Sequence, residues 1–138
     1  MIDGGALLHA VKWQQGATYA DVVPQYLSYV KQHFGCPVTI VFDGYCSGPS
    51  VKDHEHLRRV AKKGTDVLFE PNKAVYRNQT EFLANKLNKK QCIEYLMSCF
   101  VDFGYSVLQA VDDADTLIVH TALQLAHNAT CGSVTVVA

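Results

Sequence analysis

Aspartates follow apolar runs at three places in this chain, and this recurring pattern constrains the fold more than any other feature. Asp3 follows an apolar pair at the start, Asp43 follows a β-branched run, and Asp113 and Asp115 follow a third apolar run. In a parallel α/β sheet such positions are strand ends, which meet at one edge. Carboxylates gathered there repel one another and lose hydration, so a positive group must compensate them. A hard divalent cation with oxygen ligands, Mg²⁺ or Mn²⁺, fits this need.

Segments with helical and strand-like patterns alternate along the chain. The helical segments are residues 18–34, 51–63, 88–103 and 114–128, and the strand-like ones are residues 36–42, 66–69, 105–111 and 133–138. Residues 70–80 are predicted to form a loop. Pro24 predicts that the first long helix begins near Asp21, since proline is tolerated in a first turn. The alternation predicts one α/β domain over residues 1–138, with a mainly parallel central sheet flanked by helices.

Length and composition limit the class of protein. The chain has 138 residues, which suits one domain, and 18% of them are charged. No stretch approaches the ~20 apolar residues that a membrane helix needs, so no membrane partner is expected. The five cysteines are odd in number and have no CxxC spacing. This disfavours a disulfide framework and favours an intracellular setting, in the nucleus or the cytoplasm.

Positive charge is concentrated in the middle of the chain. Ten of the 12 Lys and Arg residues lie between Lys52 and Lys90, a stretch with a net charge of +5, whereas the rest of the chain carries −6. This division fits a grip on a phosphate chain beside a metal site, although exposed loops can also simply carry such residues. Lys89 and Lys90 come at the front of a predicted helix, where their charge opposes the helix dipole, which suggests that they face an anion. Lys86 is a further candidate.

Four segments together resemble the PIN-like nuclease superfamily on its flap-endonuclease-like side, with the closest likeness to uncharacterised animal PIN-like proteins. They are "IDGGALLH", "VFDGY…GPSVKDHEHLRR", "FLANKLNKKQCIEYL" and "DDADTLIVHTAL". The resemblance implies a three-layer Rossmann-like (PIN-like) domain. It also implies that Asp3, Asp43, Asp113 and Asp115 are catalytic residues that hold Mg²⁺ or Mn²⁺. Lys52, Arg58 and Arg59 fall where flap nucleases place a helical arch over nucleic acid.

The resemblance also predicts that the chain is incomplete at both ends. The first strand is shortened, and the family's last acidic motif is expected just after residue 138. An incomplete chain would lack part of the metal site and could be inactive.

The predicted function is a divalent-metal-dependent endonuclease or 5′-nuclease that hydrolyses phosphodiester bonds in structured or single-stranded DNA or RNA. The alternative is a catalytically inactive PIN-like scaffold that binds nucleic acid or protein. A nucleotide-binding α/β domain is disfavoured because no Gly-rich phosphate loop follows a strand. His9 could approach the acidic site, but a partly buried core histidine is the favoured interpretation. Substrate structure and oligomeric state are not determined by the sequence.

Overall fold

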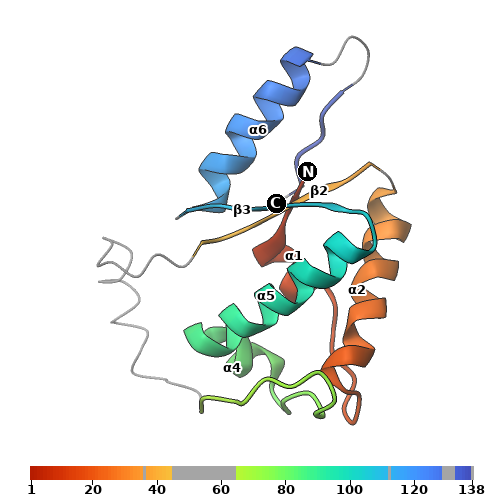
Figure 1. Ribbon diagram of the computed structural model, residues 1–138, viewed down its shortest axis with the longest axis vertical. Helices are drawn as coiled ribbons and strands as arrows, with labels where there is room; N and C mark the ends of the chain where they lie inside the picture. The colour runs from red at the N-terminus through yellow and green to blue at the C-terminus, as the bar shows by residue number, and fades with distance from the viewer. Residues whose placement is uncertain (36, 45–64, 112, 129–132, 138) are drawn as a thin grey trace.

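The chain folds around a parallel three-stranded sheet (Figure 1). The computed structural model describes residues 1–35, 37–44, 65–111, 113–128 and 133–137. The strands β1 (Ile2–Asp3), β2 (Thr39–Phe42) and β3 (Ser106–Gln109) are hydrogen-bonded in that order, and both pairs are parallel. The predicted α/β class with a mainly parallel sheet is confirmed. The predicted helix at residues 51–63 lies outside the described residues.

Five helices accompany the sheet in the described part of the chain. They are α1 (Gly4–Ala10), α2 (Tyr19–Phe34), α4 (Gln79–Ala84), α5 (Lys86–Asp102) and α6 (Ala114–Asn128). The bounds of α6 match the prediction, and those of α5 differ from it by a residue or two at each end. None of the helices described here is long and apolar enough to cross a membrane.

Different helices pack against the two faces of the sheet. Side chains alternate along a strand, so neighbouring residues of β2 point in opposite directions. Ile40 and Phe42 join the larger core, which contains residues of α1, α2, α4 and α5. Val41 packs with Ala114 and Ile118 of α6 in a second, smaller core. Figure 1 shows the same division, with α6 on one side of the strands and the other helices on the opposite side.

The last described segment runs beside β1. The predicted strand from residue 133 is present as a single parallel bridge between Ile2 and Val137. The amide of Asp3 donates to the Val137 carbonyl at 2.9 Å, and the amide of Val137 donates to the Met1 carbonyl at 2.9 Å. Since β2 pairs with the other side of β1, this segment extends the sheet on the side away from β3.

The first long helix begins earlier than its proline suggested. Thr18 caps α2: its hydroxyl accepts from the Asp21 amide at 3.2 Å, and the Asp21 carboxylate accepts from the Thr18 amide at 3.0 Å. This reciprocal capping box fixes the helix start at Tyr19, so the predicted start near Asp21 is wrong and Pro24 lies inside the helix. The predicted end is confirmed, because Gly35 terminates α2 with a φ of 69°.

The predicted strand at residues 66–69 is wrong. Its backbone donors are taken by side chains of α5: Val67 donates to Asn88 Oδ1 at 2.8 Å and Phe69 donates to Gln91 Oε1 at 3.4 Å. Asn88 Nδ2 also donates to the Thr65 carbonyl at 3.0 Å. The Asn88 side chain is fully buried, so these bonds satisfy polar groups that water cannot reach. Residues 65–69 are therefore held against α5 and form no strand.

We predict that Asn88→Ala lowers the free energy of unfolding by about 1–3 kcal/mol, because it leaves the Val67 donor and the Thr65 acceptor without their partner. Urea denaturation followed by circular dichroism measures the change. Gln32→Ala, which removes an exposed amide from α2, is the control and should change stability little. Equal stability of Asn88→Ala and the control variant would contradict the role of Asn88.

Candidate metal and nucleic-acid site

Asp3 lies at the carboxyl end of β1 and caps the helix that follows. Its Oδ1 accepts a hydrogen bond from the Gly5 amide at 2.7 Å. Gly4 has no room for a side chain, because a Cβ there would overlap the ring of Phe42. The "IDGG" segment therefore combines a strand end, a carboxylate and a tight helix start over β2.

Asp43 directly follows β2 and contacts two other elements. Its Oδ1 accepts from the Ala114 amide at 3.0 Å, which places the carboxylate at the N-terminus of α6. Its Oδ2 lies 4.0 Å from Lys89 Nζ on α5. The next residue, Gly44, packs so closely on the backbone oxygens of Ala110 and Val111 that a Cβ there would overlap them. Asp43 is thus fixed where β2, α5 and α6 meet.

The carboxylates of Asp3 and Asp43 both approach Gly5, and we call them the facing pair. A Cβ placed on Gly5 would lie 3.2 Å from Asp3 Oδ1 and 3.6 Å from Asp43 Oδ2. Their separation therefore cannot exceed the sum of these two distances. Two adjacent parallel strands bring the two acids to one edge of the sheet, as the pattern of apolar runs indicated.

Asp113 and Asp115 lie at the start of α6. Asp113 Oδ1 accepts from the Asp115 amide at 3.2 Å, which is the geometry of a helix cap. Asp115 is exposed in the first turn of α6, where its negative charge interacts favourably with the helix dipole. Asp112 lies outside the described residues.

The four acids do not form one cluster. Among the described residues, no three or more His, Cys, Asp or Glu side chains lie close enough together to hold a metal ion. The arrangement is instead a facing pair, Asp3 and Asp43, with Asp113 and Asp115 at the helix that Asp43 also caps.

The predicted basic residues of α5 differ in their surroundings. Lys89 lies beside Asp43, and only 25% of its side chain is exposed. Lys90 points toward Glu94 of the same helix, 3.9 Å away, in an exposed pair that adds little stability. Lys86, the first residue of α5, is exposed. Lys52, Arg58 and Arg59 lie outside the described residues.

His9 and Lys12 lie near Lys89, although the sequence favoured a core position for His9 and predicted no role for Lys12. His9 is exposed near the end of α1, so its interpretation as a partly buried core residue is wrong. Partial desolvation, the charge of Lys89 and the charge of Lys12 together lower the pKa of His9. One signal in the sequence could have found it: His9 follows Gly5 by one helical turn, on the face of α1 that meets Asp43.

The facing pair fits a hard divalent cation in part. Carboxylate oxygens are the right donors, and Mg²⁺ keeps several water ligands, so one or two carboxylates can define its site. Asp3 and Asp43 would hold such an ion. Asp113 and Asp115 lie at the start of α6 and form no group of three with this pair among the described residues.

Comparison with known proteins gives no relative: no family model, no curated protein and no solved structure matches this chain.

We predict that Asp43→Ala lowers the free energy of unfolding by about 1 kcal/mol, because α6 loses a cap. Asp43→Asn should lower the free energy of unfolding by less, since its amide oxygen can still accept a hydrogen bond from the Ala114 amide. Urea denaturation in EDTA measures both changes. Asp102→Ala and Asp102→Asn, at the exposed end of α5, are matched controls that should not lower stability. If Asp43→Ala were as stable as the wild type, the capping contact would contribute nothing.

Proposed function

We propose that this chain is a divalent-metal-dependent nuclease domain with a three-layer, Rossmann-like (PIN-like) fold, which hydrolyses phosphodiester bonds in nucleic acid. The observation that carries the proposal is the pair of facing carboxylates, Asp3 and Asp43, at the carboxyl ends of adjacent parallel strands. Ligands of open α/β sheets bind outside this edge. The layer arrangement is supported by helices on both faces of the sheet.

In this proposal the acids form the metal site and the lysines hold the substrate. Asp3 and Asp43 bind Mg²⁺ or Mn²⁺, and Asp113 and Asp115 complete the site from the start of α6. The bound ion supplies a Lewis acid for a phosphate oxygen and lowers the pKa of a water nucleophile. Lys89 lies beside Asp43 of the acidic pair, and Lys86 lies one turn before it on α5.

These lysines attract the substrate by charge. Cations beside the acids neutralise the phosphates on either side of the cleaved bond, which favours nucleic acid of either kind. The likeness to flap nucleases favours products with a 5′-phosphate and a 3′-hydroxyl.

A second candidate function is a PIN-like scaffold that binds nucleic acid or protein without cutting. It is favoured by the lack of a group of three acids among the described residues and by the position of Lys89, which already compensates Asp43. Binding by such a scaffold would persist in EDTA and would weaken as salt is added.

The nuclease proposal predicts that Mg²⁺ or Mn²⁺ raises the thermal midpoint of the wild type relative to EDTA. A ligand at one hundred times its Kd stabilises a protein by about 2.7 kcal/mol. Asp3→Asn and Asp43→Asn should lose this rise, because each removes a charged oxygen ligand. Cleavage of labelled single-stranded and hairpin DNA and RNA should fall about a hundredfold or more in both variants.

Asp102→Asn is the matched control, since it removes an exposed acid from the end of α5. It should keep both the metal-dependent rise and the cleavage. If a folded wild-type protein shows no rise and no cleavage with either metal, the nuclease proposal fails. Nucleic-acid binding that persists in that sample would favour the second candidate function, a scaffold that binds without cutting.

A further inference from the structure

Two lysines and a histidine come together beside the acidic pair, on the side of α1. Lys89 Nζ lies 4.0 Å from Asp43 Oδ2, and Asp43 Oδ2 lies 3.6 Å from the position of a Cβ on Gly5. His9 follows Gly5 by four residues, so it lies one turn further along the same face of α1. Lys12 comes just after the end of this helix. We call His9, Lys12 and Lys89 the basic subsite.

The end of α1 is fixed relative to α4 and α2 by buried and half-buried hydrogen bonds. Gln79 Nε2 donates to the carbonyls of Leu8 at 3.0 Å and Val11 at 2.8 Å, and Gln79 Oε1 accepts from the Trp13 amide at 3.1 Å. The Tyr26 hydroxyl also donates to the Leu8 carbonyl at 2.8 Å. The backbone on both sides of His9 and Lys12 is therefore held in place, while their side chains remain exposed.

The two ammonium groups of the basic subsite, Lys12 and Lys89, have only one carboxylate near them among the described residues. In the described part of the chain, no carboxylate lies within ion-pair distance of His9 or Lys12, and Asp43 approaches Lys89 only at the limit of such a contact. Lys12 and Lys89 both act on His9, and their positive charge lowers its pKa along with partial burial. Two ammonium groups that both act on one imidazole raise the positive potential around it, which favours the binding of an anion there. A phosphate meets this requirement, because it accepts hydrogen bonds from ammonium and imidazole groups.

We propose that His9, Lys12 and Lys89 form a phosphate-binding subsite that holds a phosphodiester group of the substrate strand next to the one at Asp3 and Asp43. The inference rests on the proposed function for the identity of the ligand as nucleic acid. His9 and Lys12 are additional to the nucleic-acid-binding residues predicted on α5 and between residues 52 and 59. Since the three groups are donors or cations, this subsite binds phosphate without any metal.

The experiment measures binding of a fluorescent 20-nucleotide single-stranded DNA to the 138-residue chain by anisotropy in EDTA. Lys12→Gln and Lys89→Gln should each weaken binding by about five- to tenfold. Each should also reduce the slope of log K against log salt by about 0.7, the value for one lost phosphate contact on a single strand.

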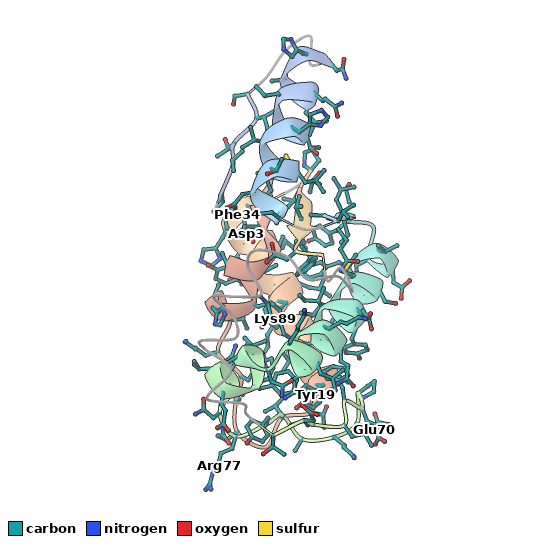
Figure 2. All side chains as sticks on the ribbon, turned by 90° about the vertical axis from the view of Figure 1, so that its left-hand side faces the viewer. Asp3, Tyr19, Phe34, Glu70, Arg77 and Lys89 are labelled. Carbon is teal, nitrogen blue, oxygen red and sulfur yellow. The ribbon has the colours of Figure 1, made fainter. Side chains whose placement is uncertain are left out.

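Lys73→Gln is the matched control. Lys73 pairs with Glu70 at 3.6 Å, and Figure 2 shows Glu70 at the end of the molecule opposite α6, away from Asp3 and Lys89. It should bind like the wild type with the same salt slope. His9→Lys is a complementary variant: His9 is mainly uncharged at pH 7.5, so a permanent ammonium there should strengthen binding by a similar factor. A gain in affinity cannot come from misfolding.

The outcomes separate this subsite from the nuclease proposal. Weaker binding by Lys12→Gln and Lys89→Gln but not by Lys73→Gln supports the subsite, whether or not metal-dependent cleavage occurs. If both variants bind with wild-type affinity and salt slope, the subsite is wrong, even where the wild type cleaves with Mg²⁺. A wild type that binds no single-stranded DNA or RNA in EDTA also overturns it.

Discussion

The contact between the Asp43 carboxylate and the N-terminus of α6 is the interaction on which the rest of the site depends. One oxygen accepts from the Ala114 amide, and the other faces Lys89 of α5 and the Gly5 position of α1. A single side chain at the end of β2 thereby links helices from both faces of the sheet. Its charge is compensated in part by a helix dipole on one side and by an ammonium group on the other.

Much of the fold could be predicted because its main signals are local. Apolar periodicity identified β2, β3, α2, α5 and α6, since each buries one face or one stripe against a neighbour. The predictions failed where distant side chains decide the backbone. Residues 66–69 have the composition of a strand, yet Asn88 and Gln91 take their amide donors. The short helix α4 is not predicted by the sequence, and its first two residues fall in the predicted loop at 70–80, because six residues give too little periodicity to recognise.

One part of the candidate site could likewise be predicted from local patterns in the sequence, and another part could not. The position of Asp3 and Asp43 followed from the ends of apolar runs, because parallel strands align those ends whatever the intervening chain does. The ranking of the lysines could not be predicted, since it depends on the rotation of α5 about its axis. Lys89 and Lys90 are adjacent in sequence, but one points toward Asp43 and the other toward Glu94. The approach of α1 to α5 brought in His9 and Lys12, which no local pattern relates to Lys89.

The acids of the candidate site also cap helices, which fixes the orientation of their carboxylates. Asp3, Asp43 and Asp113 each accept a hydrogen bond from a helix amide through one carboxylate oxygen. A carboxylate fixed through one oxygen keeps the other in a defined direction, which is the preorganisation that a binding or catalytic site requires. The same bonds stabilise α1 and α6 without any ligand. The carboxylates that the proposed site would use therefore also stabilise the starts of these helices.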